Sequence, residues 1–181
     1  NNSNSNSGAV YVYKRTGSNW AQEAYIKAAN SDNDSKFGFS VSLDGDTIVV
    51  GAPYEDSDLT TITNGTTAND NVTSADSGAV YVYKRTGSNW AQEAYIKASN
   101  NSAADLFGYS VSIDNDTLVV GAYLESSDQR TITNGTTAAS TDNSMAGTGA
   151  VYVYKRSGST WTQQAYIKAV NSNVSDNFGR S

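Results

Sequence analysis

The stretch GAVYVYKRTGSNWAQEAYIKA, which runs from Gly78 to Ala98, decides the fold of this chain. The same letters occur without a change from Gly8 to Ala28, and with four substitutions from Gly149 to Ala169. The copies lie about 70 residues apart, and self-similarity at a fixed period indicates a repeat architecture. We therefore expect an array of similar structural units.

The first half of this stretch predicts a strand that is covered on both faces. Tyr81 and Tyr83 alternate with valines, so tyrosines line one face of the strand and valines line the other. Neither face is polar, which is typical of a strand with neighbours above and below its sheet. A turn at residues 86–89 then leads to a second strand that ends near Ala98.

A second repeated block supplies two further strands. It reads FGFSVSLDGDTIVVGAP from Phe37 to Pro53 and FGYSVSIDNDTLVVGAY from Phe107 to Tyr123. In the first copy Asp44-Gly45 is a residue pair that two-residue hairpin turns prefer, and alternating residues flank it. Each block therefore predicts a β-hairpin.

Four antiparallel strands in each period predict an all-β fold made of β-propeller-type blades. The expected units are a half blade of two outer strands over 1–36, full blades over 37–106 and 107–177, and the start of another blade over 178–181. These units add up to about two and a half blades, whereas propellers close with about four to eight. We expect the partners to be further copies of this chain or further blades of a longer one.

A Phe-Gly pair and a Gly-Ala pair recur at a fixed spacing in both hairpin blocks. The motif residues are Phe37, Gly38, Gly51, Ala52 and Pro53 in the first block, and Phe107, Gly108, Gly121 and Ala122 in the second. This pattern resembles the FG-GAP repeat of integrin α-subunit propellers and of bacterial extracellular proteins, except that Tyr123 replaces the final proline. We expect the motif to act as a structural clamp between blades, with the Phe ring beneath the Gly-Ala turn and with glycines allowing close backbone approach.

The resemblance also implies a calcium loop between the first two strands of a blade. The hairpins here are too short to surround an ion with six to eight oxygens, so that site is expected to be missing. Calcium remains the one cofactor left open, and its weak candidate ligands are Glu55, Asp56, Asp58, Glu125 and Asp128. The alternative is that these carboxylates cap turns and solvate loops.

Two long loops share the sequence TITNGTT and are the candidate contact surface. Asn64-Gly65 and Asn134-Gly135 favour tight turns, so each loop is expected to project a small extra hairpin. The candidate contact residues are Thr61, Asn64, Gly65, Thr131, Asn134 and Gly135. The alternative is a tolerated insertion that was duplicated with the repeat.

Composition limits the function classes. The chain has no histidine and no cysteine, which removes the usual general base and the thiolate nucleophile, so we expect no enzyme. Its net charge of −6 argues against nucleic acid as a partner, and no apolar run is long enough to span a membrane. What remains is a non-enzymatic extracellular or cell-surface repeat protein that binds a protein or glycan in adhesion or ligand binding; the alternative is a structural subunit that assembles into a fibre or surface layer.

Overall fold

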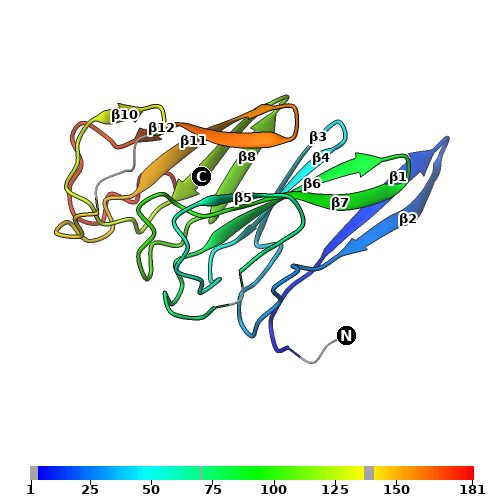
Figure 1. Ribbon diagram of the computed structural model, residues 1–181, viewed down its shortest axis with the longest axis horizontal. Helices are drawn as coiled ribbons and strands as arrows, with labels where there is room; N and C mark the ends of the chain where they lie inside the picture. Colours follow the sequence, from blue (N-terminus) through cyan, green and yellow to red (C-terminus); the bar gives the residue numbers. More distant parts are fainter. Residues whose placement is uncertain (1–3, 70, 137–140) are drawn as a thin grey trace.

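Three antiparallel β-sheets follow one another in chain order along the long axis of the molecule (Figure 1). The computed structural model describes residues 4–69, 71–136 and 141–181, and within them twelve strands are formed. The three sheets lie within residues 1–36, 37–106 and 107–177, and the second and third have five strands each where four were expected. None of the described residues forms a helix with the length and hydropathy of a membrane span.

The first sheet is a two-stranded half blade of β1 (Val10–Thr16) and β2 (Asn19–Ile26). The second sheet, blade 2, has the order β3-β4-β6-β7-β5, with the bounds β3 Ser40–Asp44, β4 Thr47–Ala52, β5 Ile62–Asn64, β6 Ala79–Thr86 and β7 Asn89–Ile96. The third sheet, blade 3, has the order β10-β12-β11-β9-β8, with β8 Ser110–Asp114, β9 Thr117–Ala122, β10 Ile132–Asn134, β11 Ala150–Ser157 and β12 Thr160–Ile167.

The described residues of the TITNGTT segments, 61–67 and 131–136, do not form the projecting hairpins expected from the sequence, and that prediction was wrong. Thr137 lies outside the described residues. Ile62–Asn64 pairs antiparallel with β7 as β5, a fifth strand at the outer edge of blade 2. The Gly65 N–H donates to the Glu93 carbonyl at 2.6 Å and continues the ladder. The edge of β7 carries unpaired backbone groups that attract a passing extended segment, so the tight turn at Asn64-Gly65 ends an added strand.

The alternation of tyrosine and valine in β6 has the expected consequence, because every residue from Ala79 to Tyr83 is buried. Tyr81 and Tyr83 pack with Val10 and Val12 of the half blade in one apolar cluster. The same arrangement recurs one blade later, where the valines of β6 pack with the tyrosines of β11. The valine face of each blade therefore covers the tyrosine face of the next.

The Phe-Gly element lies where two blades approach most closely. Phe37 and Phe107 are buried, 2% and 0% exposed, and their rings contact tyrosines of their own blade, as in the 5.1 Å edge-to-face contact of Phe107 with Tyr152. The inter-blade approach is made by backbone, because a Cβ added to Gly51 would lie 2.0 Å from the Gly108 carbonyl oxygen. The Gly-Ala step of blade 2 therefore lies directly against the Phe-Gly step of blade 3.

Candidate functional site

A buried ion pair stands at the same place in blades 2 and 3. In blade 2 the Lys97 Nζ donates to Glu55 Oε2 at 2.6 Å, and the lysine side chain is fully buried. In blade 3 Lys168 donates to Glu125 in the same way, and both side chains are 0% exposed. A hydroxyl from Ser77 or Thr148 accepts a second hydrogen bond from each amine. Charges taken out of water need such partners on every side.

An asparagine from the preceding blade completes each cluster. Asn30 follows the half blade, and its Nδ2 donates to Glu55 Oε1 at 2.9 Å. The Tyr81 hydroxyl donates to Asn30 Oδ1 at 2.6 Å. Asn100 forms the same two bonds one blade later, to Glu125 at 2.9 Å and from Tyr152 at 2.6 Å. Each cluster is therefore an inter-blade link, and we call it the inter-blade network.

Burial controls the protonation of this network. Desolvation lowers the pKa of the Lys97 amine, while the adjacent Glu55 carboxylate opposes that shift. Burial, with the Glu55 charge nearby, raises the pKa of the Tyr81 and Tyr95 hydroxyls well above their ordinary value. These hydroxyls stay protonated and serve as hydrogen-bond donors.

The sequence interpretation overlooked the lysines and asparagines of this network. The sequence did contain a signal for the buried lysine. Lys97 directly follows β7 and lies two residues after Tyr95, so in an extended chain both side chains point to the same inward face. The repeated YIKA segment places a lysine there in every copy. A charged residue that recurs in phase with buried tyrosines indicates a buried partner of opposite charge.

The candidate calcium ligands do not converge. Glu55 and Glu125 point into the core toward lysines, Asp56 accepts the Asp76 N–H at 2.7 Å, and Asp58 accepts from Asn71 at 2.6 Å. Asp128 is exposed in the corresponding loop of blade 3. Within the described parts of the chain, no three acidic side chains gather at one place. Of these five candidates, the two buried carboxylates, Glu55 and Glu125, are neutralised by lysine amines.

A second inter-blade link lies nearer the surface. The Arg156 guanidinium forms an ion pair with Glu93 of blade 2 at 3.1 Å, and the Trp161 indole N–H donates to the same carboxylate at 2.9 Å. One blade earlier, the Arg85 guanidinium forms an ion pair with Glu23 of the half blade at 3.2 Å, and the Trp90 indole N–H donates to the same carboxylate at 3.2 Å. The hydrogen bond from Trp90, together with the Arg85 charge, holds the pKa of Glu23 below its ordinary value.

Asp105 is a buried carboxylate at the boundary of blades 2 and 3, and it has no ion-pair partner among the described residues. It is 2% exposed, and one oxygen accepts the Ser102 N–H at 3.2 Å. Burial, with the Glu125 charge nearby, raises the pKa of Asp105 to about 8. The equivalent residue at the preceding boundary is Ser35, which is equally buried and carries no charge.

Replacing Asp105 by serine is expected to remove a loss of stability at alkaline pH. Because the folded-state pKa is raised above that of the unfolded chain, the contribution of Asp105 is greatest below pH ~4 and is lost as the pH rises to about 8. At pH 9 the Asp105→Ser variant should exceed the parent by about 1 to 3 kcal/mol, the cost of an uncompensated buried polar group. Urea unfolding at pH 5, 7 and 9 measures the difference, and an Asp34→Ser variant on the exposed side of the half blade serves as the control. Equal pH profiles for parent and Asp105→Ser would contradict this assignment.

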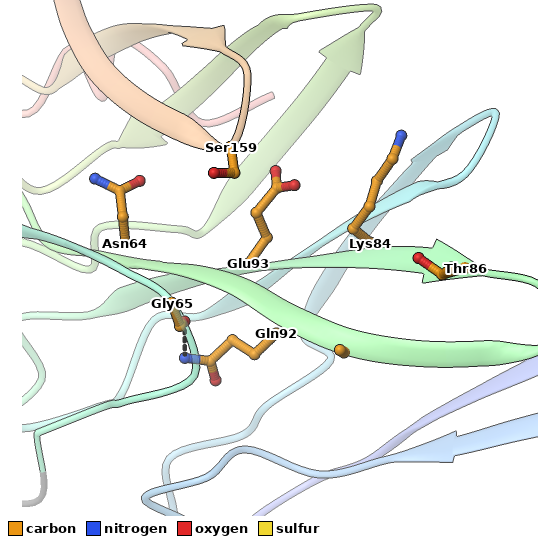
Figure 2. Close-up of a pocket in the computed structure, with 8 residues that line it drawn as sticks. Asn64, Gly65, Lys84, Thr86, Gln92, Glu93 and Ser159 are labelled. Carbon is orange, nitrogen blue, oxygen red and sulfur yellow. Dashed lines mark hydrogen bonds between the residues drawn. The ribbon is translucent and has the colours of Figure 1, made fainter.

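A groove with a volume of about 380 Å³ runs along the outer edge where blades 2 and 3 meet (Figure 2). We call it the outer groove; it is lined by Asn64, Gly65, Lys84, Thr86, Ala91, Gln92, Glu93 and Ser159. Figure 2 shows Lys84, Glu93 and Ser159 on one side of β7 and Gln92 on the other, where its amide donates to the Gly65 carbonyl. Two of the sequence-predicted contact residues, Asn64 and Gly65, therefore line this groove, and Thr61 lines the next one.

The adjoining pocket has a volume of about 290 Å³ and lies between β5 and β12. Ile62, Tyr154 and Trp161 give it an apolar floor, and threonine hydroxyls surround it. The Tyr154 hydroxyl is buried and finds no hydrogen-bond acceptor among the described residues. The Asn64 side chain lines both the groove and the pocket, and its Oδ1 accepts the backbone N–H of Trp161 at 2.8 Å.

Comparison with known proteins agrees with this architecture. No curated protein matches the chain. The pattern of the FG-GAP repeat matches residues 20–83 and 90–154, so each match runs from the outer strand of one blade to the central strand of the next. The FG-GAP repeat family and the all-β, propeller-blade fold class are thereby confirmed, whereas the bacterial extracellular type stays a prediction. The chain belongs to the FG-GAP repeat family.

Proposed function

We propose that this chain is a non-enzymatic extracellular repeat protein that acts in adhesion or ligand binding, and that the outer groove binds a glycan. FG-GAP repeats occur typically in extracellular or surface proteins and are generally non-enzymatic. The observation that carries the proposal is the groove itself, which a rigid pair of blades holds open beside the predicted contact residues Asn64 and Gly65.

The lining of the groove suits a polyhydroxylated ligand. Lys84 supplies donors, Glu93 supplies acceptors, and the Thr86 and Ser159 hydroxyls can do either. Lys84 is the one cation in this lining, and the Glu93 carboxylate is already paired with Arg156, so the groove lacks the cluster of cations that binds a phosphate or a polyanion. The neighbouring pocket adds apolar surface, as binding sites with a few oriented polar groups commonly have.

Binding to an array of bacterial and host extracellular glycans tests this proposal. For a glycan that binds, Lys84→Gln should weaken affinity by about 10-fold, the effect of one lost hydrogen bond to a charged group. Lys14→Gln is the matched control, because Lys14 holds the same place in the half blade, where no fifth strand closes a groove. Absence of any glycan binding, or equal losses for the two variants, would contradict the assignment.

A structural role is the second candidate, and the repeated interface favours it. Each blade offers a valine face and a tyrosine face that already recognise each other twice within the chain. Tyr11, Tyr13 and Tyr25 expose such a tyrosine face on the half blade, and Val119 is exposed on blade 3. Further blades, from a longer chain or from other copies, are the partners that fit these faces. Electron microscopy distinguishes closed rings from fibres, and a monomer at all concentrations in sedimentation would count against assembly from copies.

A further inference from the structure

The inter-blade network contains the reacting groups for an amide cross-link. Lys97 brings an amine, Asn30 a carboxamide, Glu55 a carboxylate that contacts both, and Tyr81 a hydroxyl on the amide oxygen. All four are at least nine-tenths buried. The constellation recurs as Lys168, Asn100, Glu125 and Tyr152. We propose that Lys97 joins Asn30, and Lys168 joins Asn100, in side-chain amide bonds that staple each blade to the one before it.

Glu55 holds the amine and the amide side by side. Its Oε2 accepts from Lys97 Nζ at 2.6 Å and its Oε1 accepts from Asn30 Nδ2 at 2.9 Å. The two reactants therefore share one carboxylate, one on each oxygen. Fixing two groups in this way replaces an encounter in solution by an intramolecular step.

The amine becomes nucleophilic by giving a proton to Glu55. Burial lowers the pKa of Lys97, which makes that transfer easier than it is in water. The neutral Nζ then attacks the Asn30 Cγ and forms the new carbon–nitrogen bond. The Tyr81 hydroxyl, 2.6 Å from Oδ1, donates to the oxygen that gains negative charge, as an oxyanion-hole donor does.

The leaving group is ammonia. Glu55 passes a proton to the departing nitrogen of Asn30 and takes one from the attacking nitrogen, so the old carbon–nitrogen bond breaks as the new amide forms. Overall a lysine ammonium and an asparagine carboxamide give a secondary amide and an ammonium ion, and the carboxylate is restored. The step needs no oxidant, reductant or other reactant.

The half blade contains an internal control. Lys27 stands at the equivalent position, but its Nζ donates to the Ser7 hydroxyl at 2.7 Å, and the described residues place no carboxylate within ion-pair distance of it. Lys27 should therefore remain a free amine. The cross-links would connect the half blade to blade 2 and blade 2 to blade 3.

The mass of the intact, denatured chain tests the proposal. Two cross-links lower it by about 34 Da relative to the sequence, about 17 Da for each ammonia lost. Tryptic digestion should leave residues 28–36 attached to the peptide that contains Lys97, while cleavage after Lys27 proceeds. A mass equal to that of the sequence, with Lys97 cleaved normally, would overturn the proposal.

Two variants separate the cross-link from other losses of ammonia. Succinimides at Asn64-Gly65 and Asn134-Gly135 would give the same mass deficit, but they hydrolyse at alkaline pH and do not depend on Glu55. Glu55→Gln should halve the deficit, whereas Asn30→Asp should lose water in place of ammonia, about 18 Da at that site, because an acid replaces the amide. A deficit unchanged in Glu55→Gln, or removed by incubation at pH 9, would show that no cross-link forms.

Discussion

The Gly78→Ala variant is expected to lose about 3 to 5 kcal/mol of stability, because a left-handed backbone and a backbone clash act together. Gly78 has φ +86°, and a Cβ there would lie 2.1 Å from the Phe107 carbonyl oxygen and 2.6 Å from its nitrogen. Those atoms are backbone and cannot rotate away, so blade 3 must shift from blade 2. Urea unfolding followed by tyrosine and tryptophan fluorescence measures the loss.

Gly87→Ala is the matched control for this clash. Gly87 has φ +67°, and nothing lies within 4 Å of its ideal Cβ position, so the variant should lose only the conformational cost of about 1 to 2 kcal/mol. The difference between the two variants isolates the inter-blade contact. Equal losses would mean that the approach of Gly78 to Phe107 does not limit stability.

The Phe107→Ala variant should lose about 3 to 5 kcal/mol, the range for truncating a buried aromatic side chain. Phe107 is 0% exposed and meets Tyr152 and Tyr154 edge to face, with ring centroids 5.1 and 6.3 Å apart. Its removal leaves a cavity in the apolar cluster shared by blades 2 and 3, so the packing between blades should loosen along with the fold. Urea unfolding gives the loss of stability, and hydrogen exchange of the β6 and β11 amides reports the loosening.

Phe39→Ala tests whether the loss depends on burial. Phe39 is 45% exposed, and its ring contacts the tilted ring of Tyr109 with the centroids 4.7 Å apart, so its truncation should cost no more than about 1 kcal/mol. Finding Phe107→Ala as stable as the parent would rule out the structural role of the Phe-Gly element. Finding both variants equally destabilised would show that the ring contact on the surface contributes as much as the buried contact.

The sequence by itself determined the blades, because the signals for them are local. The pair Asp44-Gly45 fixes a two-residue turn, and β3 and β4 pair across it from Asp44 to Thr47 onward. The alternation of tyrosine with valine in β6 indicates that both faces of the strand are buried, but it does not show which residues cover them. Because the sequence repeats almost exactly, a strand or turn predicted in one blade is predicted at the same place in the next. The family and the fold class therefore followed from the residues alone.

Only the tertiary structure decided where the remaining segments pair. The sequence of Ile62–Asn64 is equally compatible with a local hairpin and with an added strand. The segment pairs with β7 because the backbone groups at the outer edge of β7 have no other strand beside them at that point. Glu55 lies in the loop after β4, yet it is buried because it pairs with Lys97, which follows β7 more than 40 residues later in the chain. Asn30 meets that pair from a different blade. The free energy of a buried charge depends on its partners, and here those partners are distant in the chain. Local sequence patterns do not show which distant residues will meet in the fold.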